Sequence, residues 1–203
     1  MPITVKKLFQ QVELPIHGKF QWQQKVQSDA KGIYVVSLSS DPDKIVTLPE
    51  PSFVDEKIHE WMNNAPGMKL DGQTPSIEVI KERLKQFWLP DETIVYIGQT
   101  TKNTLGKRVN QYYKSKIGKG APHSGGHWIK TLECLEQMTV YWSELDGNNC
   151  PEVCEQRLLD AFQSQVSNET RDRLYDKDRV MPFANLEYPK GIKKRHRFTS
   201  QRG

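Results

Sequence analysis

The sequence predicts an α+β fold, in which helices flank a small, mixed three-stranded β-sheet. Three segments rich in β-branched and aromatic residues predict the strands, and segments with apolar residues at helical spacing predict the helices. The chain has 203 residues, of which 36% are hydrophobic and 27% are charged. These values suit a single domain with a substantial core, so we expect residues 1–203 to form one unit.

The predicted strands are residues 32–39, 93–99 and 138–145. The first reads GIYVVSLS and runs into the turn-forming sequence SDPD. The second reads TIVYIGQ and the third MTVYWSEL. Each is short and dominated by residues that favour a pleated, half-buried surface.

Helices are predicted in the other periodic segments of the chain: residues 52–64, 74–89, 104–116 and 151–163, with a short helix near 5–12. Ser52 is expected to cap the first of these, and Pro75 to occupy the first helical position of the second. Four glycines and a proline predict a loop from 118 to 126. Beyond Pro189 we expect little regular structure.

The charge distribution is more informative than the net charge of +4. Two segments contain basic residues and no acid, while the rest of the chain is acidic. Two such blocks are typical of an electrostatic footprint for a polyanion, the alternative being a solvated tail and helix face. The basic residues of residues 93–132 are Lys102, Lys107, Arg108, Lys114, Lys116, Lys119 and Lys130, and those of the C-terminal tail, residues 188–203, are Lys190, Lys193, Lys194, Arg195, Arg197 and Arg202.

Several classes of protein are disfavoured by the bulk sequence. There is no run of 18 apolar residues, so no membrane span is expected, and the first residues do not resemble a secretory signal. Three cysteines fit a reducing cytoplasm better than a disulfide framework, and no zinc-binding set is evident. We therefore expect a cytoplasmic protein.

Two tripeptides stand at the ends of this chain's first two predicted strands. Gly32-Ile33-Tyr34 opens the first, and Tyr96-Ile97-Gly98 lies in the second. Further polar residues follow them in order: Arg108 and Tyr112 one helical turn apart, Glu155 on a later helix, and Asn185 shortly after a proline.

With these residues the chain resembles the GIY-YIG nuclease family, from about residue 31 to residue 187 with the inserted residues 35–95 left out. The resemblance implies the three-stranded family fold, a metal-dependent nuclease activity, and a catalytic set of Tyr34, Tyr96, Arg108, Tyr112, Glu155 and Asn185. In a compact chain of this kind it implies a type II restriction endonuclease that cuts duplex DNA at a short site. A structure-selective repair or recombination nuclease and a catalytically silent nucleic-acid-binding module are the alternatives.

Phosphodiester hydrolysis gives each residue a chemical role. Glu155 would hold a divalent cation, Mg²⁺ with Mn²⁺ able to substitute, because one carboxylate suits a cation that keeps most of its waters. The planar guanidinium of Arg108 would contact the phosphate. Tyr34 is our expected base, with Tyr96 and Tyr112 as hydrogen-bonding neighbours. A phenol with a pKa of about 10 needs nearby cations for this role.

The partner expected from the basic blocks is double-stranded DNA, and one active site per chain favours a homodimer. A glycine-rich loop after the Arg108 helix adds two histidines, which we expect to contact DNA because the glycines between them argue against a helical metal pair. The predicted DNA-binding residues are Lys102, Lys107, Lys114, Lys116, Lys119, His123, His127, Lys130, Lys190, Lys193, Lys194, Arg195 and Arg197.

One feature departs from the family. Its two tripeptides are usually joined by a short hairpin, whereas 61 residues, from 35 to 95, lie between them here. This insertion contains two predicted helices and could carry substrate specificity, dimer contacts or additional core. Residues 1–31 form a further N-terminal extension.

Overall fold

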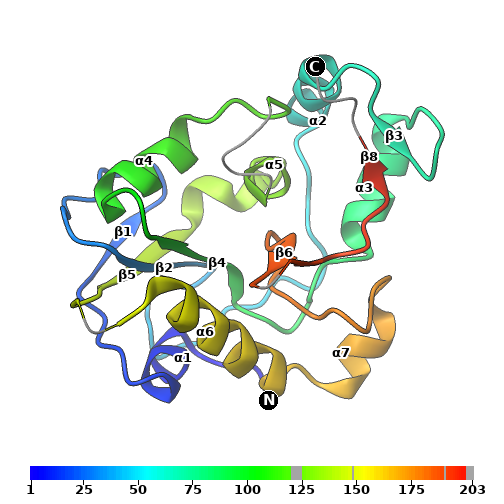
Figure 1. The fold of residues 1–203 in the computed structure, drawn as a ribbon. Coiled ribbons are helices and arrows are strands. Elements are labelled where there is room, and N and C mark those ends of the chain that lie inside the picture. Colours follow the sequence, from blue (N-terminus) through cyan, green and yellow to red (C-terminus); the bar gives the residue numbers. More distant parts are fainter. Residues whose placement is uncertain (120–124, 148, 190, 200–203) are drawn as a thin grey trace.

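Four antiparallel strands form the central sheet of the protein. A computed structural model describes residues 1–119, 125–147, 149–189 and 191–199. The strands lie in the order β1 (Gly18–Gln21), β5 (Thr139–Glu144), β2 (Gly32–Ser37) and β4 (Ile94–Thr100) (Figure 1). All three predicted strands are present, as β2, β4 and β5. The prediction of a mixed three-stranded sheet was wrong, because β1 adds a strand and every pairing is antiparallel.

The additional strand β1 pairs with the outer side of β5. Phe20 lies opposite Val140, and the peptide groups of the short sequence GKFQ complete the edge of the sheet. Only alternate side chains of β1 are partly buried. A four-residue edge strand with two charged or amide side chains has no β-branched run, so the sequence does not predict it.

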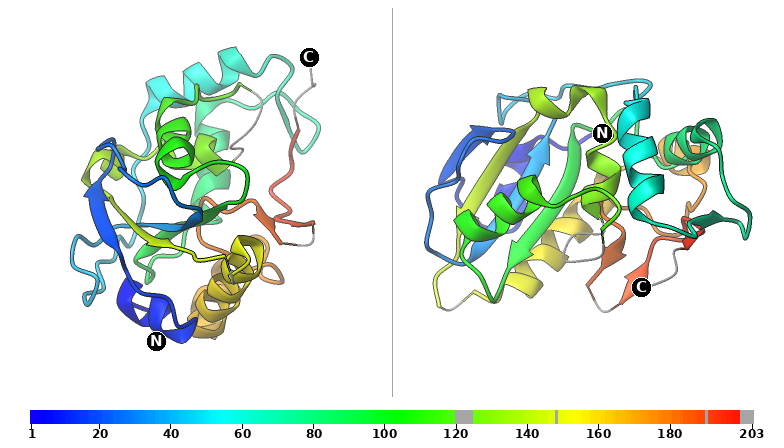
Figure 2. Two further views of the ribbon diagram at one scale, coloured as in Figure 1. Left: turned by 60° about the vertical axis from the view of Figure 1, so that its left-hand side comes forward. Right: turned by 90° about the horizontal axis from the view of Figure 1, so that it is seen from above.

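Helices cover both faces of this sheet. The helix α4 (Leu105–Lys114) packs on one face, and α1 (Val5–Gln11) and α6 (Pro151–Gln165) pack on the other (Figures 1 and 2). Two separate clusters of buried apolar residues correspond to the two faces. The amphipathic segments predicted from the sequence as helices therefore bury their apolar sides against opposite faces of one sheet.

The insertion between β2 and β4 contains the two expected helices, α2 (Asp55–Asn64) and α3 (Ile77–Lys85), and the short strand β3 (Lys69–Leu70). Both helices begin later than predicted. The N-cap of α2 is Val54, because Phe53 forms an extended bridge with Leu132 before the helix starts. The N-cap of α3 is Ser76, whose hydroxyl accepts a hydrogen bond from the helix.

The C-terminal tail has more regular structure than predicted. Its strands are β6 (Glu187–Tyr188), β7 (Ile192–Lys193) and β8 (Phe198–Thr199). The first two pair with each other, and β8 pairs with β3 of the insertion. Phe198 packs on Trp61 of α2 with ring centroids 5.3 Å apart. The tail is therefore held against the insertion by backbone pairing and by aromatic contacts.

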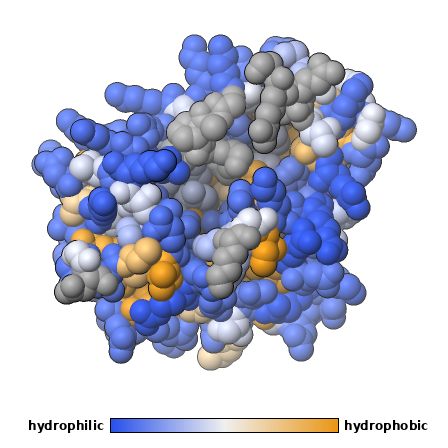
Figure 3. Space-filling view, in the orientation of Figure 1, coloured by the Kyte–Doolittle hydropathy of each residue, from blue (hydrophilic) through white to orange (hydrophobic). Residues whose placement is uncertain are grey.

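Three short helices complete the described chain: α5 (Gly125–Ile129), a 3₁₀ helix (Glu133–Gln137) and α7 (Asn168–Arg173). The predicted loop at 118–126 was wrong at its end, because the last two glycines belong to α5. Hydrophilic residues cover most of the face shown in Figure 3. Within the described ranges, no helix has both the length and the apolar character needed to cross a membrane.

Candidate active site

The tyrosines of the two sequence motifs lie beside each other on one face of the sheet. Across β2 and β4, Tyr34 is opposite Gly98 and Val36 is opposite Tyr96. The centroids of the two phenol rings are 5.7 Å apart. The register of this strand pair therefore brings together residues that are 62 positions apart in the sequence.

Gly98 makes the position of these rings possible. A Cβ atom at Gly98 would lie 2.8 Å from the Tyr34 Oη and 2.6 Å from a ring carbon of Tyr96. Both distances are shorter than ordinary van der Waals contact, so a larger residue would displace at least one phenol. The glycine of the second tripeptide thus leaves the space into which the tyrosine of the first one packs.

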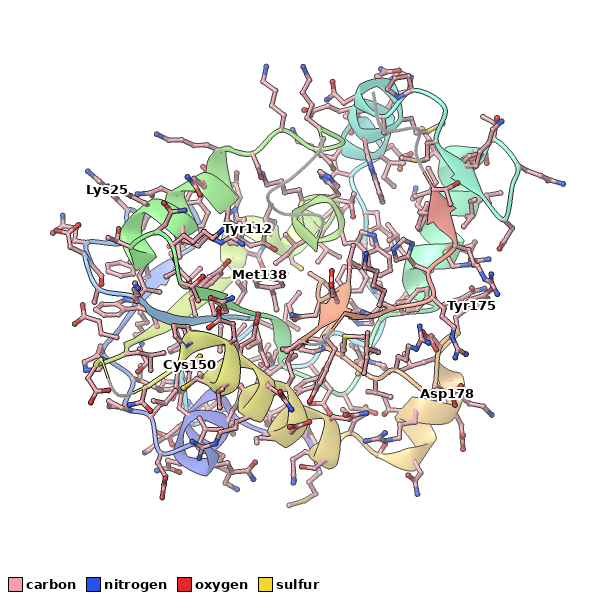
Figure 4. The ribbon with its side chains drawn as sticks, viewed as in Figure 1. Lys25, Tyr112, Met138, Cys150, Tyr175 and Asp178 are labelled. Atoms are coloured by element: carbon pink, nitrogen blue, oxygen red, sulfur yellow. The ribbon has the colours of Figure 1, made fainter. Side chains whose placement is uncertain are left out.

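The helix α4 adds Arg108 and Tyr112 to the same place. The Thr104 hydroxyl caps the helix by accepting a hydrogen bond from the Lys107 N–H at 3.3 Å. Tyr112 is fully buried beneath the helix (Figure 4), and its ring centroid is 5.1 Å from that of Tyr96. One turn earlier, the charge of Arg108 is close enough to lower the pKa of Tyr34.

Glu155 reaches this group from α6, on the other side of β4. Burial raises the pKa of its carboxyl to about 7, while the charge of Arg108 opposes this change and Glu152 adds to it. Glu155 also raises the pKa values of Tyr34 and Tyr96 electrostatically. Four elements, β2, β4, α4 and α6, therefore bring five of the six predicted catalytic residues into one electrostatically coupled group.

The tyrosines are protonated phenols in the free protein at neutral pH. Burial raises the pKa of Tyr34 to about 12, although Arg108 and the Tyr96 hydroxyl both lower it. The pKa values of Tyr96 and Tyr112 are raised well above 10, again mainly by burial. The cation that we expected to favour the Tyr34 phenolate is present, but the cost of burying the anion is larger.

Two buried polar atoms at this site lack partners among the described residues. The Arg108 Nε and the Gln99 Oε1 form no hydrogen bond within the described ranges, whereas the Tyr34 hydroxyl has Tyr96 and Arg108 as weak hydrogen-bonding neighbours. Buried polar groups are nearly always paired, and each orphan costs about 1–3 kcal/mol. Two such atoms near one carboxylate indicate a site whose polar ligand completes the bonding.

Asn185, the sixth predicted catalytic residue, binds the backbone of the second tripeptide. Its Oδ1 accepts a hydrogen bond from the Ile97 N–H at 2.9 Å, and its Nδ2 donates one to the Ile97 carbonyl at 2.8 Å. Because β4 is the last strand of the sheet, these bonds replace those of a neighbouring strand. Both polar ends of the Asn185 side chain are thus used in positioning Tyr96 and Gly98.

A metal ion at this site would depend on few protein ligands. The described residues contain no group of three His, Cys, Asp or Glu side chains that could enclose an ion. Glu155 forms no ion pair with any described residue, so its oxygens are not already neutralised in that way. One carboxylate near the unpartnered Gln99 Oε1 fits Mg²⁺, which binds few carboxylates and keeps several waters.

Five of the predicted DNA-binding lysines are exposed around α4 and after it. None of them forms an ion pair with a described residue, so their charges are available to a polyanion. They are Lys102, Lys107, Lys114, Lys116 and Lys119.

Three other predicted DNA contacts have structural roles in the protein instead. The Lys194 ammonium is buried and donates hydrogen bonds to the carbonyls of Pro182 and Phe183 at 3.1 and 3.0 Å. The Lys130 ammonium donates to the Ser115 hydroxyl at 2.8 Å and to neighbouring carbonyls. These lysines cannot reach a phosphate without leaving their partners.

His127 is the third of these residues. Its Nδ1 accepts a hydrogen bond from the Gly118 N–H at 3.0 Å, and burial lowers its pKa to about 4. It is therefore neutral and fixes the loop after α4. His123 and Lys190 lie outside the described residues. In the tail, Lys193 and Arg197 are exposed, while the exposed Arg195 forms an ion pair with Asp178 at 3.4 Å.

The sequence did not identify two contributors to the site. Gln99 is one, and its only signal was its position directly after Gly98. The other is residues 22–31, whose Ala30 and Ser28 carbonyls accept hydrogen bonds from the Leu105 and Gly106 N–H groups. These bonds occupy the free donors of the first turn of α4 and fix the helix that carries Arg108.

Comparison with known proteins gave no match, so a proposal for the function depends on the geometry of this site. No family model matches the chain, and no curated protein or solved structure matches it.

Proposed function

We propose that the protein is a GIY-YIG-type endonuclease that hydrolyses DNA phosphodiester bonds with the help of a divalent cation. The observation that carries this proposal is the convergence of Tyr34, Arg108 and Glu155 from three separate elements. Together they supply what a phosphodiester and its attacking water require, namely a cation, a hydrogen-bonding phenol and a carboxylate, and the Arg108 Nε is buried without a partner among the described residues.

Each residue has a role in this chemistry. Arg108 would neutralise charge that develops on the phosphate oxygens, with its orphaned Nε available as one arm of a bidentate contact. Tyr34 would orient the attacking water through its hydroxyl. It would accept a proton only once the bound ligands offset the effect of burial on its pKa. Tyr96 and Tyr112 would hold Tyr34 in place, and Asn185 would hold the strand that carries Tyr96.

Glu155 would bind Mg²⁺ or Mn²⁺, which supplies charge neutralisation at the phosphate when bound. Metal binding requires the ionised carboxylate, and the nearby Arg108 favours that form. Because burial raises the pKa of this carboxyl to about 7, a cation that binds at neutral pH would displace the proton that the free protein partly holds there.

The substrate that we propose is duplex DNA, cut within a short site in the manner of a type II restriction enzyme. The exposed lysines on and after α4 lie next to Arg108 in the chain and would bind the DNA backbone. Cutting two strands with one active site per chain favours a homodimer. The three cysteines are free thiols, which supports a cytoplasmic location.

Incubation of the purified protein with plasmid DNA, with Mg²⁺ or with EDTA, tests the proposal. We expect discrete fragments with Mg²⁺ only, whereas cleavage confined to junctions or flaps would favour a repair nuclease. No cleavage with Mg²⁺ or Mn²⁺ would contradict the proposal and leave a binding module.

The first mutation that we predict to matter is Glu155→Gln. It removes the metal-binding charge but keeps the shape of the side chain, so cleavage should fall by more than ~100-fold, the upper end of what losing an outer-shell partner costs. Glu152→Gln is the matched control, because Glu152 is an exposed glutamate on the same helix. Equal activities of the two variants, measured as initial cleavage rates, would refute the role of Glu155.

A further inference from the structure

Gln99 carries a buried oxygen that the roles described above do not use. The residue directly follows Gly98 in β4, and its Oε1 is buried without a hydrogen-bond partner in the described chain. An amide oxygen in water would have donors on both lone pairs, so its burial without a partner costs free energy. An orphaned acceptor next to a proposed active site indicates that its donor arrives with a ligand.

The strand pairing places Gln99 on the same side of β4 as Glu155. Gln99 lies opposite Ile33 and shares a sheet face with Ile97, two residues earlier. Ile33 and Ile97 belong to the apolar cluster that contains Leu158 of α6. Glu155 precedes Leu158 by one helical turn and so lies on the same side of α6. Because α6 contacts β4, the face of β4 that carries Gln99 lies next to the side of α6 that carries Glu155.

Gln99 is next in the chain to Gly98, against which the Tyr34 hydroxyl packs. β4 therefore carries the orphaned amide oxygen beside the residue that Tyr34 contacts. The side chain of Gln99 points toward the α6 side, from which Glu155 reaches the same group.

The Gln99 Oε1 can only accept a hydrogen bond, so its partner must be a donor. Phosphate oxygens only accept hydrogen bonds, so they cannot satisfy the Gln99 Oε1. Waters bound to a divalent cation are strong donors. Since the described residues offer no group of three metal-binding side chains, the cation would keep several waters, each of which needs an acceptor.

We propose that the Gln99 Oε1 accepts a hydrogen bond from a water of the divalent cation that Glu155 binds. This proposal rests on the proposed function and assigns Gln99 as a positioning residue of its metal site. A neutral amide adds an oxygen without adding a second negative charge beside Glu155. The cation is thereby oriented through its hydration shell as well as through the carboxylate.

Direct binding of Mn²⁺ to the full chain tests the assignment without requiring catalysis. The fraction of free Mn²⁺, measured by electron paramagnetic resonance at pH 8.5, gives the dissociation constant of each variant. Gln99→Leu removes the acceptor and should raise this constant about tenfold, the size typical of an outer-shell loss. Gln99→Glu keeps an acceptor and adds charge, so it should lower the constant. Gln11→Leu, at an exposed glutamine of α1, should leave it unchanged.

Distinct outcomes separate this proposal from the proposed function. Wild-type affinity in Gln99→Leu would overturn the role of Gln99 even if the wild type cuts DNA. Weaker Mn²⁺ binding in Gln99→Glu would also overturn it, because the buried atom would then be the amide nitrogen acting as a donor. If the wild type bound no Mn²⁺ and cut no DNA, the proposed function itself would fail. Should the leucine variant not fold, the glutamate variant decides by the same criterion.

Discussion

Asn185 shows how a single side chain can substitute for a missing strand. An edge strand exposes N–H and C=O groups that have no neighbour, and Asn185 pairs with both groups of Ile97 through one amide. Ala184 extends the contact, since its N–H donates to the Val95 carbonyl at 2.9 Å. The edge of β4 is therefore fixed at the residue between Tyr96 and Gly98.

We predict that Asn185→Ala lowers the free energy of unfolding by about 2 to 4 kcal/mol, because it leaves two buried backbone groups unpaired at about 1–3 kcal/mol each. Denaturation in urea measures this loss. Asn168→Ala is the control, as Asn168 is exposed at the start of α7 and should change stability by less than about 0.5 kcal/mol. Similar small effects for both variants would show that the hydrogen bonds to Ile97 contribute little.

The sequence predicted the grouping of some site residues correctly and the exposure of others wrongly. Tyr34, Tyr96, Arg108, Tyr112 and Glu155 were predicted as a set, and the structure brings them together. The sequence could not show that Lys194 is buried and His127 partly buried, because a lysine or histidine in a basic, polar segment is expected to be exposed. Their positions depend on aromatic partners far away in the chain, such as Trp61 for His127.

At the level of elements, α4 depends on the N-terminal extension as well as on the sheet. Gly106 lies so close to residues 26–28 that a Cβ there would be 2.7 Å from the Val26 carbonyl oxygen and 3.0 Å from that of Ser28. The same segment accepts hydrogen bonds from the first turn of the helix. The orientation of Arg108 is therefore determined partly by residues that carry no motif.

We predict that Gly106→Ala reduces cleavage more than its effect on folding would suggest. Intrinsic helix propensity alone favours alanine by about 1 kcal/mol, but the close backbone contact opposes it, and overpacking of this kind costs about 1–3 kcal/mol. The helix should shift away from the extension and move Arg108. Cleavage rate and urea denaturation should be compared with those of Gly147→Ala, where a Cβ has open space. Unchanged cleavage in Gly106→Ala would argue against this coupling.

Element starts and edge strands were the least predictable parts of the fold. Apolar periodicity located the four main helices and three strands, because those segments bury one face. Ser52 matched a capping pattern, but its segment pairs with residues near Leu132 and the helix begins only after it. Pairings such as β3 with β8 join residues more than 120 positions apart, and local sequence carries no signal for them.

For the molecule as a whole, the tail and the insertion are joined around the buried Lys194. Its ammonium lies 5.3 Å from the centre of the Trp128 ring and 5.6 Å from that of Phe87, in addition to its carbonyl partners. These carbonyls belong to the segment that leads into Asn185. The inserted helices, the tail and the edge of β4 are therefore connected through one buried cation.

Titratable groups with shifted pKa values make the stability of the protein depend on pH. Burial raises the pKa of Glu92 to about 7 from 4.5, so between these values the native state binds more protons than the unfolded state and the free energy of unfolding falls as pH rises. Burial lowers the pKa of Lys194 to about 7 from 10.5, so above pH 7 the unfolded state binds more protons and stability rises again. Burial also lowers the pKa values of His127 and His196 to about 4, which opposes the effect of Glu92 below pH 7, so the clear prediction is a rise in stability above pH 7.

Urea denaturation from pH 4.5 to 10, in EDTA, measures this profile. Each pKa unit corresponds to about 1.4 kcal/mol, so the rise above pH 7 should amount to a few kcal/mol. Lys194→Met should reduce this rise and raise stability at pH 7, since methionine fills the apolar site without a charge; a smaller rise should remain, because burial also lowers the pKa of Lys130 to about 8. Glu92→Gln should raise stability at pH 7 relative to pH 4.5, because the amide carries no charge that burial destabilises. A fall in stability between pH 7 and 9, or an undiminished rise in Lys194→Met, would show that the Lys194 ammonium is not destabilised by its burial.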